Sequence, residues 1–150
     1  GFLPHAVRQL RQSPRPSWSQ IVASHDSRWW HSPEEGRDLL LKLVAKADAV
    51  ANNLRGDQPA RLGVTYDDLK SVNPRIVCAH LSAYGRTGPR AAWPGYDYLM
   101  QAEAGHMSLT GEPDGPPVRY GLSIVDLMTG LAASFALLAG VRRARECGLS

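Results

Sequence analysis

The segment Gly121-Leu-Ser-Ile-Val-Asp-Leu-Met-Thr-Gly130 marks the point where an extended apolar run gives way to the longest helical pattern of the chain, from Leu131 to Ala144. Asp126 stands at this change. An acidic residue there is typical of a helix N-cap, because its side-chain oxygens accept the free N–H groups of the first turn and the helix dipole favours negative charge. On the local pattern alone an N-cap is the more common interpretation, and a positioned carboxylate nucleophile is the alternative.

Outside this segment, Arg75-Ile-Val-Cys-Ala-His-Leu-Ser82 predicts a buried parallel strand, because it is β-branched early and apolar on both faces. A shorter strand is expected over residues 48–54, and Ser32-Pro-Glu-Glu predicts a capped helix before it. The alternation of helices and short apolar strands favours an α/β fold. Further helices are expected at residues 59–62, 65–72 and 97–107, and an extended segment at residues 118–125.

The composition limits the classes of function. The 150 residues fit one domain, and a net charge of +3 is too mild to indicate nucleic-acid binding. Cys78 and Cys147 form no paired-cysteine framework, so a reducing, cytoplasmic location is expected. The apolar stretch Gly130–Val141 is too short to span a bilayer, and no membrane partner is expected.

Residues 1–31 mix Arg, Ser, Pro and Trp without helical or alternating period, and are expected to be a poorly ordered or non-homologous terminal segment. Residues 32–150 are expected to form the folded part. The chain has no initiator Met, which suggests a fragment.

Several catalytic motifs are absent: the chain has no G-x-S-x-G, P-loop or G-x-G-x-x-G pattern. The five histidines have no metal-ligand spacing, so no metal site is expected, and His80 is interpreted as a satisfied core or edge histidine. What remains is a set of polar residues at strand ends and helix starts, which can meet in one crevice of an α/β fold. Each also has a structural interpretation: Arg61 as a surface charge, Asp97 as a cap, Tyr96 as a core aromatic. The set is Asn53, Arg55, Arg61, Tyr84, Tyr96, Asp97 and Asp126.

A series of short segments, in consistent order and spacing, resembles the class III CoA-transferases, which include formyl-CoA transferase, the carnitine CoA-transferases and α-methylacyl-CoA racemase. The resemblance covers about four-fifths of the chain, from Ser32 onward. It implies an incomplete Rossmann-like large domain. The matching segments are Ala47–Asn53 with Arg61-Leu-Gly63, Asn73–Val77, Tyr84–Pro89, Pro94–Asp97, Thr110–Pro117 and Asp126–Gly130.

The resemblance implies that Asp126 is a nucleophile that attacks an acyl-CoA thioester. An aspartyl anhydride and an aspartyl-CoA thioester would follow, before CoA passes to a carboxylic acid. The amides at the start of the helix are expected to stabilise the oxyanion. No tightly bound cofactor is implied, because coenzyme A and acyl-CoA are substrates. By the same resemblance the coenzyme A contacts are Asn53, Leu54, Arg55, Arg61, Trp93, Pro94, Gly95, Tyr96 and His31.

Two alternatives remain open. An acyl-CoA racemase that epimerises 2-methylacyl-CoA would use a histidine where this chain has Tyr96, so Tyr96 favours a transferase. An inactive truncated fragment is the second alternative, because residues 1–31 lack the family's first strand and its CoA-binding loop. The resemblance also implies an interlocked homodimer for the full-length protein.

Overall fold

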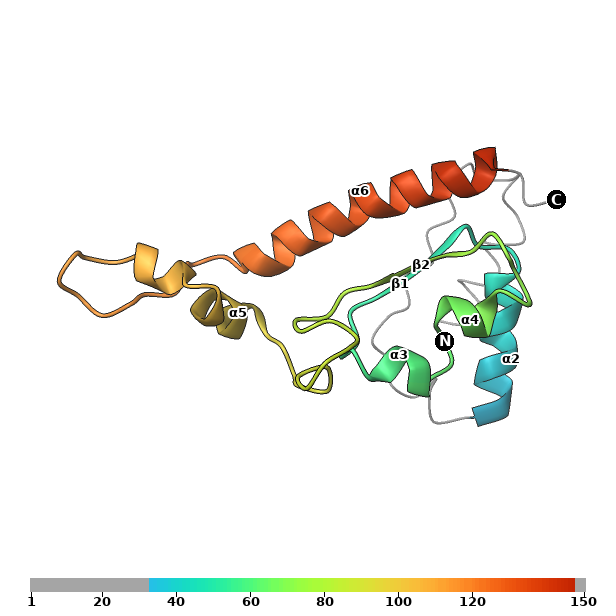
Figure 1. Ribbon diagram of the computed structural model, residues 1–150, viewed down its shortest axis with the longest axis horizontal. Coiled ribbons are helices and arrows are strands. Elements are labelled where there is room, and N and C mark those ends of the chain that lie inside the picture. Colours follow the sequence, from blue (N-terminus) through green and yellow to red (C-terminus); the bar gives the residue numbers. More distant parts are fainter. Residues whose placement is uncertain (1–32, 148–150) are drawn as a thin grey trace, which may run out of the picture.

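A computed structural model describes residues 33–147, with side chains from residue 36 onward. The predictions for residues 1–31 and for the Ser32 cap lie outside this range. Two short strands form a parallel sheet: β1 (Ala49–Asn52) pairs with β2 (Val77–His80), with Asn52 opposite His80. In Figure 1 the helix α6 (Ile124–Glu146) lies along one side of the two strands, and the helices that precede β2 in the chain lie on the other side. The predicted α/β fold with short parallel strands is confirmed.

The core lies where the first helix, α2 (Pro33–Val44), packs beside the sheet. Leu69 is 0% exposed and Val44 is 1% exposed, and both form one buried hydrophobic cluster with Ala47 and Ile76. The amide of Asn73 donates to the carbonyls of Val44 (3.1 Å) and Ala47 (2.8 Å). This side chain therefore bonds the carbonyl of the last residue of α2 and a second carbonyl in the turn that follows the helix.

Two short helices connect the strands. The first, α3 (Gln58–Arg61), has Pro59 in its first turn and is followed by Gly63, whose φ of 64° suits glycine. The second, α4 (Tyr66–Leu69), begins with the predicted capping box, in which the Asp68 carboxylate accepts the backbone N–H of Thr65 at 3.0 Å. Both predicted helices are present, although α4 ends at Leu69 rather than at Val72.

The predicted helix from Asp97 to Met107 is wrong in its second half. The helix α5 covers Asp97–Glu103, and a separate 3-10 helix, η2, covers His106–Leu109. Gly105 lies between them with a φ of 78°, a left-handed conformation that interrupts an α-helix.

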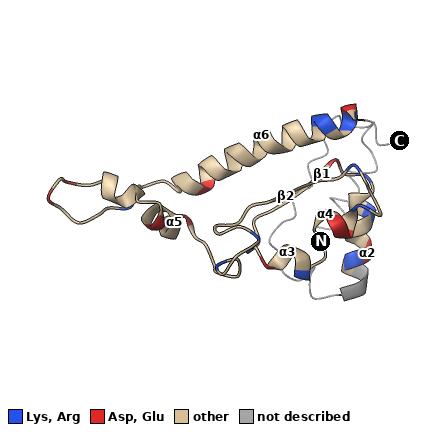
Figure 2. Ribbon diagram, in the orientation of Figure 1, with Lys and Arg blue, Asp and Glu red and all other residues tan. Residues whose placement is uncertain are grey.

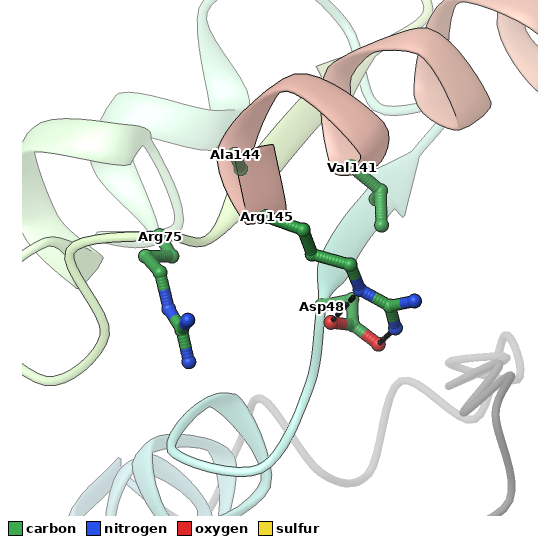
Figure 3. A pocket seen from close by; sticks show the side chains of 5 residues that line it. All are labelled: Asp48, Arg75, Val141, Ala144 and Arg145. Atoms are coloured by element: carbon green, nitrogen blue, oxygen red, sulfur yellow. Dashed lines mark hydrogen bonds and ion pairs between the residues drawn. The ribbon is translucent and has the colours of Figure 1, made fainter. Parts of the chain in front are cut away.

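The longest helix, α6 (Ile124–Glu146), packs against β2, where a Cβ atom on Gly140 would come 2.9 Å from Cγ1 of Val77. Its C-terminal turn is joined to the start of β1 by an ion pair between Arg145 and Asp48 at 2.8 Å (Figure 3). The helix begins at Ile124, two residues before Asp126, where the sequence pattern placed the helix cap. The extended segment predicted at residues 118–125 is wrong: residues 118–123 form no strand, and Ile124 and Val125 belong to α6.

Charged residues occupy only a few positions of α6, mostly in its last turns (Figure 2). The helix has 23 residues, a mean hydropathy of 1.9 over its most apolar window, and no buried residue in that window. By length and composition this helix could cross a membrane. The prediction that the apolar stretch is too short to span a bilayer, which considered only Gly130–Val141, is therefore wrong. A helix that is apolar on all sides is also typical of the interior of a larger α/β fold.

Candidate functional site

Asp126 is the third residue of α6, and the prediction that it forms the N-cap is wrong. Ser123 occupies the N-cap position, and it makes no side-chain capping hydrogen bond. The acceptor comes instead from α5: Oδ2 of Asp97 accepts the N–H groups of Val125 at 2.8 Å and Asp126 at 3.1 Å. These are the two amides that an N-cap side chain normally serves. Asp97 thus caps a helix whose bonded residues lie 28 and 29 positions further along the chain, and the side chain of Asp126 stays exposed.

Asp97 is 8% exposed, yet it is held as a carboxylate. Burial alone would raise its pKa, but the hydrogen bonds from the Asp126 N–H, the Gln101 amide and the Val125 N–H outweigh burial and lower the pKa below the usual value. The negative charge also suits the amino end of α6, where the helix dipole is positive. The sequence-based interpretation of Asp97 as a cap is therefore correct in kind, but the helix that it caps is α6.

Gln101, one turn along α5 from Asp97, is 0% exposed. Its amide nitrogen donates to Oδ1 of Asp97 and to the carbonyl of Leu122 at 3.2 Å. Its amide oxygen accepts the N–H of Tyr120 at 2.9 Å. Asp97 and Gln101 together fix the chain on both sides of the turn that leads into α6.

The amides at the start of α6 are not free to stabilise an oxyanion, contrary to prediction. Val125 and Asp126 donate to Asp97, and Ile124 donates to the carbonyl of Leu122 at 2.9 Å. Because each of these N–H groups has an acceptor within the chain, an oxyanion would have to be stabilised by other groups.

The loops that follow the two strands meet closely. A Cβ atom on Gly56, after β1, would lie 1.9 Å from the carbonyl oxygen of Gly85, after β2. Similarly, a Cβ atom on Gly95 would lie 2.1 Å from Cβ of Ala83. Only glycine permits these approaches. The structure thus brings together the segments after β1, after β2 and before α5, as predicted for the carboxyl ends of parallel strands.

Two of the predicted basic residues share one acidic partner. Arg55 contacts Oδ2 of Asp57 at 3.3 Å, and Arg61 contacts the same oxygen at 3.5 Å. The side chain of Arg61 remains 71% exposed, so its guanidinium is accessible to an anionic ligand. Asn53 lies exposed and Leu54 half-buried just before this group.

Aromatic side chains pack together in the segment between β2 and α5. Trp93 meets Tyr84 edge to face, with ring centroids 5.8 Å apart, and the guanidinium of Arg90 lies 4.9 Å from the centre of the Tyr84 ring. Glu103 accepts the Tyr84 hydroxyl at 2.8 Å and pairs with Arg90 at 2.7 Å, and its hydrogen bond raises the pKa of Tyr84. This network fixes the loop that follows β2 against α5.

Tyr96 is the N-cap residue of α5 and is 54% exposed. Its ring stacks on that of Tyr98, with centroids 5.7 Å apart and planes only 5° from parallel. The interpretation of Tyr96 as a core aromatic is therefore wrong for the described residues, and the ring is available to a ligand.

The predicted site residues form two groups. Asn53, Leu54, Arg55 and Arg61 lie together beside Asp57, whereas Tyr96 lies next to Asp97, which contacts Asp126. Among residues 36–147, no hydrogen bond or ion pair joins the two groups directly. Trp93, Pro94 and Gly95 lie exposed in the chain between them. His31 lies outside the described residues.

Two surface hollows lie away from these residues. One of about 130 Å³ is lined by Asp48, Arg75, Val141, Ala144 and Arg145, and Figure 3 shows Arg75 pointing away from the Asp48–Arg145 pair. It lies at the amino ends of the strands, which is not where α/β sheets place ligands. The other, of about 280 Å³, is formed by residues 108–117. Neither includes a predicted site residue.

His80 is satisfied only in part. Its Nδ1 pairs with the Asn52 amide at 2.9 Å across the sheet, while its Nε2 is buried without a partner among the described residues. Burial lowers the pKa of His80, and the charge of Arg86 lowers it further. The imidazole is therefore neutral at neutral pH.

The sequence prediction missed Asp57 and Gln101. Asp57 stands two residues after Arg55 and four before Arg61, a spacing that indicates a shared ion pair. Gln101 stands four residues after Asp97 on the same helix face, but its main-chain partners at Leu122 and Tyr120 depend on tertiary structure.

Comparison with known proteins gives a consistent result. A family model described as CoA-transferase family III matches residues 32–149. The chain is 50% identical over 113 residues to an acyl-CoA transferase of Fusarium pseudograminearum, which covers 75% of this chain and 25% of that protein. It is 39% identical over 114 residues to a succinate–glutarate CoA-transferase of Agrobacterium fabrum, covering 76% of this chain and 28% of the relative.

The fold agrees with the sequence. The crystal structure of a CaiB/BaiF family protein from Brucella suis superposes with a TM-score of 0.70 at 39% identity, covering 77% of this chain and 31% of that one. The predicted resemblance is therefore confirmed. The chain spans between a quarter and a third of the length of these relatives.

Proposed function

The chain belongs to CoA-transferase family III, and on that basis we propose that the whole protein transfers coenzyme A from an acyl-CoA thioester to a carboxylic acid. The observation that supports this most strongly is the family match over residues 32–149, which includes Asp126. Asp126 is exposed on the first turn of α6, so its carboxylate is accessible to a thioester.

The reaction we propose begins with Asp126 attacking the thioester carbonyl. The C–S bond breaks, and an aspartyl–acyl anhydride and CoA thiolate result. The thiolate then attacks the aspartyl carbonyl, which releases the donor acid with one oxygen from Asp126 and leaves an aspartyl-CoA thioester.

The acceptor carboxylate reverses these two steps. It attacks the aspartyl thioester, displaces the thiolate and forms a second anhydride. The thiolate attacks the acceptor carbonyl, so the new acyl-CoA leaves and Asp126 is restored with one oxygen from the acceptor. Each step exchanges one activated acyl group for another, so no step is far uphill.

Coenzyme A binding is assigned to the group around Asp57. Arg55 and Arg61 carry guanidinium groups held by one carboxylate, and an incoming phosphate can replace part of that contact at Arg61, which is 71% exposed. Asn53, Leu54 and the segment Trp93–Tyr96 complete the proposed contacts. His31 is kept as a further basic contact of the proposal, outside the described residues.

Substrates, assembly and location are part of the same proposal. The named relatives include a succinate–glutarate CoA-transferase and an acetyl-CoA:oxalate CoA-transferase, so succinyl-CoA and acetyl-CoA are the first donors to try, with dicarboxylates as acceptors. We further propose residues 32–150 as part of the large catalytic domain, with residues 1–31 separate from it, an interlocked homodimer for the full-length protein, and a cytoplasmic location.

The test is chemical trapping. The full-length protein is incubated with succinyl-CoA or acetyl-CoA and then with hydroxylamine, which converts an activated aspartyl group to a hydroxamate. Mass spectrometry should locate this adduct on Asp126 and find none in Asp126→Asn. Because the Asp126 side chain does not cap α6, that variant should fold normally. An unmodified Asp126 with every donor would refute the proposal.

A further inference from the structure

The first turn of α6 is held from outside the helix. An N-cap side chain usually belongs to the residue just before the helix, but Ser123 makes no such bond. Oδ2 of Asp97 accepts both the Val125 and the Asp126 N–H groups. One oxygen atom on α5 therefore bonds directly to the main chain of the proposed nucleophile.

The second oxygen of Asp97 is also hydrogen-bonded, which fixes the orientation of the carboxylate. Oδ1 accepts the Gln101 amide, and Gln101 is fully buried with its remaining polar groups bonded to Leu122 and Tyr120. With both oxygens engaged and only 8% of its surface exposed, the Asp97 carboxylate has one orientation. A buried polar group whose bonds are all made rigidifies its surroundings.

We propose that Asp97 is a positioning residue for Asp126. Its carboxylate, oriented by Gln101, fixes the direction of the first turn of α6 and thereby the placement of the Asp126 side chain toward the thioester. This inference rests on the proposed function. Asp97 itself does not touch the reacting atoms.

Loss of a positioning residue should affect kcat and KM differently. The Asp97 carboxylate bonds only to Gln101, Val125 and Asp126 among the described residues, and to none assigned to coenzyme A binding, its neighbour Tyr96 included, so its loss should leave the KM for acyl-CoA nearly unchanged. A misplaced nucleophile lowers the rate of the chemical step, and a displacement on the order of 1 Å costs about 10²-fold. The expected signature is a fall in kcat with little change in KM.

The experiment compares three variants of the full-length protein with wild type. Asp97→Ala removes both acceptor oxygens, and Asp97→Asn keeps one. Asp68→Asn is the matched control, because Asp68 also accepts a main-chain N–H bond at a helix start, that of Thr65 at α4, and its pKa is lowered by its bonds to Thr65. Each variant is measured for kcat, for KM and for the rate of hydroxamate formation at Asp126 with succinyl-CoA, all per folded protein.

The expected result is a kcat lower by about 10²-fold in Asp97→Ala, partial recovery in Asp97→Asn, and a kcat close to wild type in Asp68→Asn. If Asp97→Ala does not fold, Asp97→Asn decides: an unchanged kcat and trapping rate in that variant overturn the inference. Equal losses in Asp97→Asn and Asp68→Asn also overturn it, since they show a general effect of helix capping. Absence of any hydroxamate in wild type refutes the proposed function, and the positioning role with it.

Discussion

Replacement of Gly56 by alanine tests the close approach of the two loops that follow the strands. The added Cβ atom would lie 1.9 Å from the Gly85 carbonyl oxygen and 3.0 Å from that of Ala91. Real Cβ contacts are essentially never shorter than 3.0 Å, so the loops must separate by about 3.0 − 1.9 = 1.1 Å. The obstacle is main chain, which cannot rotate away as a side chain can.

The cost has two opposing parts. Forcing extra atoms into a packed contact costs about 1–3 kcal/mol. Alanine also reduces the conformational entropy of the unfolded chain, which stabilises the folded protein by about 0.4–1 kcal/mol. This gain applies here because Gly56 does not have a positive φ. The net loss in the free energy of unfolding is about 1–2 kcal/mol, which lowers the urea midpoint by about 0.5–1 M for a typical m-value. The affinity for coenzyme A should fall as well, since Arg55 precedes Gly56 directly.

Urea unfolding followed by circular dichroism measures the first effect, and isothermal titration with coenzyme A measures the second. Gly130→Ala is the control: Gly130 lies within α6, the added Cβ meets no described atom within 4 Å apart from its chain neighbours and the backbone of its own helix, and alanine favours helix. A Gly56→Ala variant as stable as Gly130→Ala, with unchanged coenzyme A affinity, would refute the account of how the loops meet.

Three further perturbations probe the core and the sheet. Leu69→Ala should lower the free energy of unfolding by about 2–5 kcal/mol because Leu69 is 0% exposed, whereas Leu109→Ala, at an 83% exposed position, should change it by less than about 0.5 kcal/mol in urea titrations. Asn73→Ala leaves the Val44 and Ala47 carbonyls without their amide partner and should cost about 1–3 kcal/mol by the same assay; a loss within error would show that water replaces the amide. Burial lowers the pKa of His80 in the folded protein below its usual value of about 6.5. As pH falls, His80 therefore binds a proton in the unfolded protein before it does so in the folded protein. The free energy of unfolding should decline as the pH is lowered through about 6.5. His80→Gln should flatten that part of the stability profile measured by thermal unfolding, and an unchanged slope would show that other groups cause it.

Much of the fold could be predicted from local patterns. The run Arg75–Ser82 is apolar on both faces, and its residues Val77–His80 form β2 of a parallel pair, although among the described residues they are half-buried rather than buried. Thr65 and Asp68 form the expected capping box because both partners lie within one turn. The end of α5 was misplaced, since Gly105 adopts a left-handed conformation where the apolar pattern continues.

The candidate site was predicted less completely, because its decisive bonds join distant residues. The pattern at Asp126 suggested a self-capped helix start, but the acceptor is Asp97, 29 residues earlier. No local pattern indicates which helix an acidic side chain caps. Gln101 and the closeness of Gly56 to Gly85 depend in the same way on tertiary packing.

The central claim, that Asp126 is the nucleophile, is tested most directly by measuring the transfer of an oxygen atom from the acceptor to Asp126. The full-length protein is incubated with succinyl-CoA and an acceptor dicarboxylate labelled in both carboxyl groups with oxygen-18, and the peptide that contains Asp126 is then weighed by mass spectrometry. If Asp126 is the nucleophile, this peptide gains oxygen-18 only when both substrates are present, and the label lies on the Asp126 carboxylate. Turnover that leaves Asp126 unlabelled would contradict the account.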